Sequence, residues 1–208
     1  MKVPELLGRS DYALISELIP EGARVLDLGC GDGALLAWLK ENKRVMARGV
    51  EIKRDLVQAA VARGVTVYQG DIEASLTDYP DGAFDFVILS QTLQETRRPQ
   101  AVLERMLRVG RHAIVAFPNF GHWRVRLAHL TSGRAPRTPL FPYNWYESPN
   151  INFLTVMDFE EFLRNQSWQI ERRMFLAGHR RIEWSPNLLC EIAVYLIRRG
   201  CKVCYSDN

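Results

Sequence analysis

Residues 25–33 read Val-Leu-Asp-Leu-Gly-Cys-Gly-Asp-Gly, a short apolar run that ends in three glycines spaced two residues apart. The apolar run predicts a buried strand over residues 24–28, and the Leu- and Ala-rich stretch 34–41 predicts a helix directly after the glycines. Glycines between a strand and a helix let the chain turn tightly and let a ligand approach the backbone. The stretch therefore predicts a ligand-binding turn in an α/β fold.

The rest of the chain continues this alternation of strands and helices. Apolar patterns predict strands over 45–50, 65–69, 84–89 and 113–117, and helices over 11–19 (with Ser10 as N-cap), 55–63 and 100–108. Helices between strands imply parallel crossover connections, and nearly continuous apolar runs are typical of strands covered on both faces. Further along, a helix is expected over 158–165, capped by Thr155 or Asp158, and strands over 169–176 and 188–197.

Residues 118–152 interrupt this regularity and form an expected insertion within a single domain that spans 1–208. Such a segment predicts a lid, a binding surface or hidden short helices. Its arginines are interleaved with aromatic residues: Arg124, Arg126, Arg134 and Arg137 with Trp123, Phe141, Tyr143, Trp145 and Tyr146. This mixture is enriched at protein interfaces and also stacks on single-stranded bases. A lid that doubles as a partner surface is the first interpretation, a lid alone the second and a nucleic-acid surface the third.

Composition limits the class of protein. The 208 residues are 47% hydrophobic and 25% charged, which is ordinary for one globular domain. A formal net charge of +3 is too mild to indicate nucleic acid by itself. No apolar run reaches the roughly 18 residues of a membrane span, and residues 1–9 lack the apolar core of a signal peptide. We therefore expect a cytoplasmic protein with neither nucleic acid nor membrane as partner.

The four cysteines do not indicate a disulfide framework or a metal site. They are Cys30, Cys190, Cys201 and Cys204. A chain of this length has its own core, and a single CxxC pair without a nearby histidine does not complete a tetrahedral zinc site. The pair lies in residues 200–208, which we expect to be a disordered tail.

Acidic residues follow the predicted strands at positions suited to one ligand. Asp27, Glu51 and Asp71 lie near the ends of three successive strands, whose carboxyl ends share one edge of a parallel sheet. Gly29, Gly31 and Ala34 also satisfy the dinucleotide pattern G-x-G-x-x-A. However, the carboxylate of Asp27 would repel a pyrophosphate and attract an ammonium or sulfonium group. S-adenosylmethionine carries both cations and no phosphate, so it is favoured over a nicotinamide cofactor.

Each acidic residue also has a structural interpretation. Asp27 or Asp71 could cap a turn, and Glu51 could be a solvated charge at a strand end. Any one of them alone would more often be structural, and the coincidence of three at strand ends favours a binding site.

Residues 25–33 resemble the first motif of class I S-adenosylmethionine-dependent methyltransferases. The resemblance implies a Rossmann-like, doubly wound, mostly parallel seven-stranded sheet with an antiparallel last strand. It also implies S-adenosylmethionine or S-adenosylhomocysteine as ligand, with the turn around the methionine part, Glu51 on the ribose, Asp71 beside the adenine and Ser90-Gln91 facing the sulfonium and the methyl acceptor. The expected cofactor-binding residues are Asp27, Gly29, Cys30, Gly31, Glu51, Ile52, Asp71, Ile72, Ser90 and Gln91.

Three further motifs narrow the resemblance to the methionine biosynthesis protein MetW family. They are Leu-Ser-Gln-Thr-Leu-Gln at 89–94, Pro-Asn-Phe-Gly-His-Trp at 118–123 and Tyr-Asn-Trp-Tyr-Glu-Ser-Pro-Asn-Ile at 143–151, with Asp-Phe-Glu-Glu-Phe at 158–162 in addition. The resemblance covers about residues 6–197. It implies a cofactor-binding protein of methionine synthesis that acts with homoserine O-acyltransferase as an accessory or regulatory partner.

The alternative is an active methyltransferase on a small metabolite. Methyl transfer to nitrogen or oxygen needs a positioned base or a polar clamp on the acceptor. The stretch Ser90-Gln91-Thr92 is neutral, and neither Gln91 nor Gln94 takes up a proton at neutral pH. His122 is the candidate base, although a lone histidine in such a segment is more often a hydrogen-bonded structural group.

Overall fold

The computed structural model describes residues 9–200. The expectations for the N-terminal residues before Arg9 and for the tail with Cys201 and Cys204 lie outside these residues. Within 9–200, no helix combines the length and the apolar character that a membrane crossing requires.

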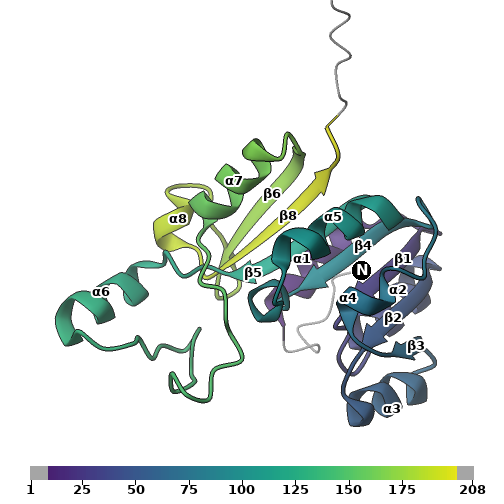
Figure 1. The fold of residues 1–208 in the computed structure, drawn as a ribbon, viewed down its shortest axis with the longest axis horizontal. Coiled ribbons are helices and arrows are strands. Elements are labelled where there is room, and N and C mark those ends of the chain that lie inside the picture. The colour runs from purple at the N-terminus through teal and green to yellow at the C-terminus, as the bar shows by residue number, and fades with distance from the viewer. Residues whose placement is uncertain (1–8, 201–208) are drawn as a thin grey trace, which may run out of the picture.

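The centre of the molecule is one mixed sheet in the order β3-β2-β1-β4-β5-β8-β6-β7 (Figure 1). The strands are β1 (Arg24–Leu28), β2 (Met46–Glu51), β3 (Thr66–Gln69), β4 (Phe84–Ser90), β5 (Gly110–Pro118), β6 (Gln169–Ala177), β7 (Arg180–Arg181) and β8 (Ile192–Arg198). The five from β3 to β5 are parallel, and β8 runs antiparallel to both β5 and β6. The predicted class I methyltransferase fold is confirmed. The two-residue β7 adds an eighth strand at the edge.

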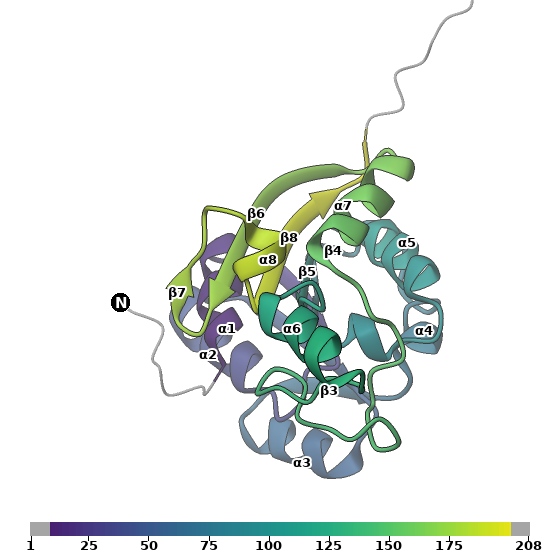
Figure 2. The ribbon, with the colours of Figure 1, turned by 90° about the vertical axis from the view of Figure 1, so that its left-hand side faces the viewer.

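Helices cover both faces of this sheet (Figure 2). They are α1 (Ser10–Leu18), α2 (Ala34–Lys43), α3 (Arg54–Ala62), α4 (Ile72–Ser75), α5 (Pro99–Val109), α6 (Trp123–Ser132), α7 (Val156–Asn165) and α8 (Pro186–Leu189), with a 3-10 helix, η2 (Leu93–Glu95). Neighbouring strand residues point to opposite faces. Val115 and Phe117 pack into the core beneath α5 and α7, and Ile114 and Ala116 into the core beneath α1 and α2. This double burial explains the continuous apolar runs.

Several predicted element boundaries were wrong; β5, for example, begins at Gly110 rather than at residue 113, and α7 begins at Val156 rather than at residue 158. Ser10 is the first residue of α1, and Arg9 occupies the N-cap position without a capping side-chain bond. The last strand begins at Ile192 rather than at residue 188, because residues 186–189 form α8 with Pro186 in its first turn, where the missing N–H costs nothing. The cap of α7 is confirmed: Thr155 and Asp158 form a reciprocal capping box.

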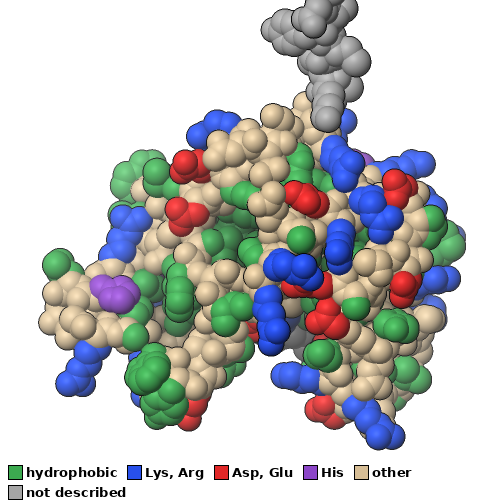
Figure 3. Space-filling model, viewed as in Figure 1, with side chains coloured by type: hydrophobic (Ala, Val, Ile, Leu, Met, Phe, Trp, Pro, Cys, Tyr) green, Lys and Arg blue, Asp and Glu red, His purple; other side chains and the backbone are tan. Residues whose placement is uncertain are grey.

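The insertion, residues 118–152, extends beyond the carboxyl end of β5, on the left of Figures 1 and 3. It contains α6, a hidden helix that buries only Val125. Its far end is fixed to the β4–α5 connection, since the amides of Ile151 and Asn152 donate to the carbonyl oxygen of Gln94 at 2.9 and 3.0 Å. The insertion is therefore attached next to the carboxyl ends of the central strands.

Candidate functional site

The glycine turn lies where the sequence predicted it, between β1 and α2. The amides of Gly29 and Cys30 donate to the carbonyl oxygen of Val50 at 2.8 and 3.1 Å, which ties the turn to the end of β2. Gly29 has a φ of +74°, and a Cβ there would approach the Thr92 hydroxyl to 2.9 Å. Gly31 also has a positive φ, but nothing lies within 4 Å of its Cβ position. The backbone at Gly31 is thus open to a ligand.

Asp27 is a buried carboxylate with one oxygen that has no hydrogen-bond partner. Its side chain is on β1, the residue is only 4% exposed, and Oδ1 has no hydrogen-bond partner. The pKa of Asp27 is raised to about 7, mainly by burial; the positive charge of Arg9 lowers it, and the negative charges of Asp11 and Glu51 add to the rise. An unpaired buried carboxylate oxygen is costly, so a cationic ligand group would be bound well here.

Glu51 is held rigidly at the end of β2. Its Oε2 accepts from the amide of Gly31 at 3.0 Å, and its Oε1 accepts from the amides of Ile52 and Lys53, both at 2.9 Å. The carboxylate therefore joins the glycine turn to the second strand. The side chain of Ile52 is exposed beside it.

Asp71 caps a helix, which is the structural interpretation that its sequence context offered. Its Oδ1 accepts from the amides of Glu73 and Ala74 at 2.8 and 3.1 Å and caps α4. A cavity of about 910 Å³ opens beside Asp71 and Ile72, and Thr92, the neighbour of Gly29, also lines it. The cavity therefore lies between the end of the third strand and the connection that follows β4.

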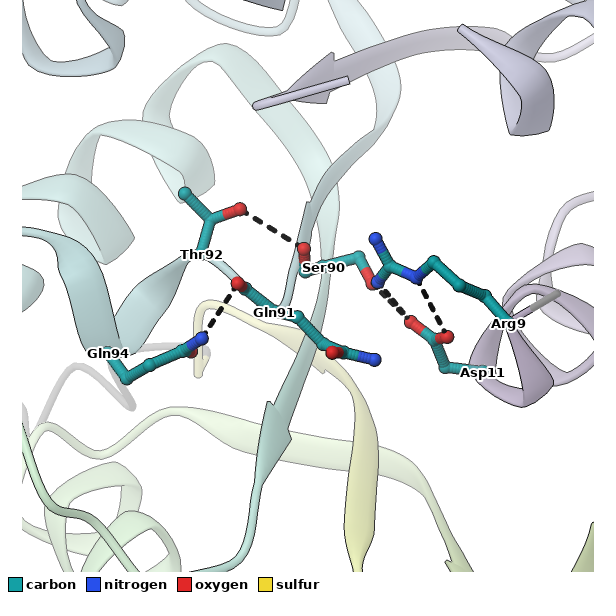
Figure 4. A network of polar contacts seen from close by, with 6 residues as sticks. All are labelled: Arg9, Asp11, Ser90, Gln91, Thr92 and Gln94. Atoms are coloured by element: carbon teal, nitrogen blue, oxygen red, sulfur yellow. Dashed lines mark hydrogen bonds and ion pairs between the residues drawn. The ribbon is translucent and has the colours of Figure 1, made fainter. Parts of the chain in front are cut away.

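Ser90 belongs to a polar network that the sequence did not reveal (Figure 4). Its hydroxyl donates to Oδ2 of the fully buried Asp11 at 2.5 Å, and Nη2 of Arg9 donates to Asp11 Oδ2 and to Ser90 Oγ at 2.6 and 2.7 Å. The Arg9 guanidinium also lies 4.4 Å from the centroid of the Tyr12 ring. Arg9 and Asp11 are about 80 residues from Ser90 in sequence, and no local pattern signals such a contact. The network places a cation at the end of β4.

Gln91 and Gln94 link the end of β4 to the insertion. It adopts a φ of +52°, and its carbonyl oxygen accepts from Nε2 of Gln94 at 2.7 Å (Figure 4). The same Gln94 accepts from Ile151 and Asn152 through its backbone, whereas its buried Oε1 has no partner. One residue thus contacts both the turn after β4 and the far end of the insertion.

His122, the candidate base, caps α6. Its Nδ1 accepts from the amide of Arg124 at 3.3 Å, and burial lowers its pKa below the ordinary value. The ring is therefore neutral near pH 7, with one nitrogen already in a structural bond; its catalytic role stays a prediction. The adjoining Asn119 is a missed residue: it is fully buried and donates to the carbonyl oxygens of Asn187 and Cys190, which fixes the start of the insertion.

Cys30 takes part in the glycine turn through its backbone, and its thiol is not reactive. Its side chain is buried, and burial raises the pKa of the thiol, so it stays protonated. Across residues 9–200, no cluster of three His, Cys, Asp or Glu side chains has an arrangement that would hold a metal ion.

Residues 9–197 match the family model of the methionine biosynthesis protein MetW. The chain belongs to the MetW family. A bifunctional methionine biosynthesis protein MetXA/MetW from Rhodopirellula baltica is 37% identical over an alignment of 202 positions, and the alignment covers 91% of this chain and 32% of that protein. This MetW chain therefore spans about a third of the length of that relative.

Solved structures show the fold of this MetW protein. An S-adenosylmethionine-dependent methyltransferase from Archaeoglobus fulgidus superposes with a TM-score of 0.69 at 14% identity, over 94% of this chain and 95% of that one. A similar enzyme from Mesorhizobium loti gives 0.68 at 16% identity, over 93% and 100%. The [4+2]-cyclase SpnF gives 0.64 at 18% identity, over 91% and 80%. Because a cyclase shares the fold, the fold alone does not determine the reaction.

Proposed function

We propose that this MetW protein binds S-adenosylmethionine at the carboxyl ends of β1, β2 and β4, and serves methionine biosynthesis as a partner of homoserine O-acyltransferase. The observation that supports this proposal most directly is the buried Asp27 oxygen, which has no hydrogen-bond partner and lies on β1, just before the turn that contains the open backbone at Gly31. A carboxylate in this position attracts the ammonium or sulfonium group of the ligand and repels a phosphate.

The neighbouring residues fit the other parts of this ligand. Asp27 would hold the ammonium group, and Arg9, which already lies close enough to act on the charge of Asp27, would hold the carboxylate of the same amino-acid end. Glu51 would accept from the ribose hydroxyls, and the cavity beside Asp71 and Ile72 would receive the adenine. The backbone at Gly29, Cys30 and Gly31, with Ser90 and Gln91, would surround the methionine part.

The bound ligand would supply an activated methyl group, but the chain's own residues favour binding over transfer. Ser90 already donates to Asp11, and the glutamines that follow cannot take up a proton. The accessory interpretation is supported by the relative that joins MetXA and MetW in one chain. The second candidate, methyl transfer to a small metabolite, is favoured by the fold shared with S-adenosylmethionine-dependent methyltransferases.

Calorimetry with three ligands tests the cofactor part of the proposal. S-adenosylmethionine and S-adenosylhomocysteine carry the amino-acid end, and methylthioadenosine lacks it. We expect Glu51→Ala to weaken all three and Arg9→Ala to weaken only the first two, by about tenfold or more, the usual scale for a charged hydrogen bond. Failure of the wild-type chain to bind S-adenosylmethionine at millimolar concentration would refute the cofactor proposal.

Rate measurements test the accessory role. The homoserine acyl-transfer rate of the acyltransferase from the same organism is compared with and without this chain, at zero and saturating S-adenosylmethionine. A rate that depends on the chain supports the partnership, and a further effect of the cofactor makes the chain a sensor. No effect under any condition, together with transfer of a labelled methyl group to a cell-extract metabolite, would favour the methyltransferase instead.

A further inference from the structure

The insertion contains an apolar cavity of about 410 Å³. One wall is α6, and the other is the irregular chain that follows it. The lining residues are mostly aromatic or aliphatic: Phe120, Val125, Arg126, His129, Ala135, Pro136, Phe141, Tyr143, Trp145, Ser148, Asn150 and Phe153. Phe120 stacks on Phe141 with 3.8 Å between the ring centroids and meets Phe153 edge-on with 4.8 Å between the centroids. The aromatic walls therefore pack against one another. The cavity is thus built from residues that pack together.

Large apolar side chains of the insertion are exposed, among them Trp145, which lines the cavity. Trp145 is 80% exposed, Leu130 85% and Tyr146 67%. Hydrophobic side chains gather on the lobe that the insertion forms, on the left of Figure 3. A segment that combines an apolar cavity with exposed tryptophan, tyrosine and leucine is typical of an interaction site.

The insertion also carries all of the chain's net charge. Residues 118–152 contain four arginines, no lysine and a single acidic residue, Glu147, which gives a formal charge of +3. The whole chain is also +3, so the rest of the molecule is neutral. Positive charge around an apolar cavity complements an acidic surface with an apolar anchor.

We propose that the insertion is a docking site for an acidic protein segment, and that a bulky apolar side chain of this segment enters the cavity. The proposal rests on the proposed function, because it assigns this segment to the acyltransferase partner. Interface hot spots are commonly aromatic and arginine residues around a pocket that an anchor fills. The cavity supplies the pocket, and Arg134 and Arg137 flank Ala135 and Pro136, which line it.

The geometry favours a protein over a single-stranded nucleic acid. Bases bind by stacking on open aromatic faces. Here the facing sides of Phe120 and Phe141 are occupied by each other, so no base can stack between these two rings of the cavity wall. What remains is an apolar hollow, which a side chain fills better than a strand of bases does.

The test measures binding of the full chain to the homoserine O-acyltransferase of the same organism. Trp145→Ala removes an exposed aromatic side chain from the cavity wall, and Ala135→Trp fills the cavity from an exposed position. We expect each to weaken binding at least tenfold. Trp184→Ala is the matched control, because Trp184 is 76% exposed and lies outside the insertion. For charge, Arg137→Glu should weaken binding severalfold and flatten its salt dependence, whereas Arg172→Glu on β6 should not.

The possible outcomes test the docking site, the partnership and the identity of the occupant separately. If the wild-type chain binds the acyltransferase and the Trp145, Ala135 and Arg137 variants bind equally well, the docking site is wrong and the partnership stands. If the wild-type chain does not bind it, the partnership fails, and the docking proposal fails with it. If light scattering shows a dimer of this chain that Trp145→Ala abolishes, or if RNA binds in a Trp145-dependent way, the occupant is a second copy or RNA and the proposal is overturned.

Discussion

The proposed cofactor crevice and the insertion hold the residues proposed to act there in opposite ways. Asp27, Glu51 and Ser90 are buried at the ends of parallel strands, where hydrogen bonds between strands fix the backbone. The exposed Trp145 and Tyr146 lie on irregular chain, and their rings contact each other edge-on. The difference indicates a rigid site for a small ligand and an attached surface that can change without cost to the sheet.

The largest expected effect contrasts the stability of the two regions. Phe117 on β5 is fully buried between Phe159 and Tyr195. Phe117→Ala should lower the free energy of unfolding by about 3–5 kcal/mol, as for other buried aromatic truncations. Trp145→Ala should change it by less than about 0.5 kcal/mol, because the side chain is mostly exposed. Urea denaturation measures both, and equal losses would show that the insertion is part of the cooperative core.

Asp27→Asn tests what the charge of Asp27 contributes to ligand affinity and to stability in the crevice. The substitution keeps the shape of the side chain and removes the charge that the ligand's cation needs, so we expect affinity for S-adenosylmethionine to fall about 30-fold or more. It should also stabilise the ligand-free protein at pH 8, on the order of 1–3 kcal/mol, because a buried unpaired charge is removed. Calorimetry and thermal unfolding measure the two effects. Asp78→Asn, at an exposed position, is the control, and a variant that loses stability would contradict the interpretation.

The position of the crevice was largely predictable from sequence because it follows from the topology of the sheet. Once β1, β2 and β3 are parallel neighbours, the residues that end them must share one edge, whatever lies between them in sequence. Arg9 and Asp11 were not predictable, since their contact with Ser90 depends on how α1 packs against the sheet. The helix in the insertion was anticipated only as one of three options, because α6 buries a single residue and lacks an apolar periodicity. Its cavity depends on aromatic packing that has no sequence period.

The pH dependence of ligand binding tests the charge state of Asp27. Its pKa of about 7 in the folded protein lies above the ordinary 3.8, so below pH 7 the ligand must displace a proton from it. The affinity for S-adenosylmethionine should fall about tenfold per pH unit between 6 and 5. Between about pH 4 and 7 the folded state holds this proton and the unfolded state does not, so the contribution of Asp27 to stability falls as pH rises. Asp27→Asn should remove both dependences, and a slope that persists in this variant would assign them to another group.

Gln94→Met gives the smallest effect and tests whether the two regions communicate. The variant keeps the side-chain length, loses the bond to the Gln91 carbonyl oxygen and removes the buried oxygen that has no partner. Since these two changes oppose each other, stability should stay within about 1 kcal/mol of the wild type. Affinity for S-adenosylmethionine should change less than about threefold, because Gln94 lies behind the residues proposed to contact it.

The informative quantity is the ratio of acyltransferase affinities with and without S-adenosylmethionine. If Gln94 transmits the state of the crevice to Ile151 and Asn152, this ratio should move severalfold toward one in Gln94→Met and stay unchanged in Gln100→Met on α5. A ratio that is the same in both variants and in the wild-type chain would show that Gln94 only fastens the insertion, and that the crevice and the docking surface work independently.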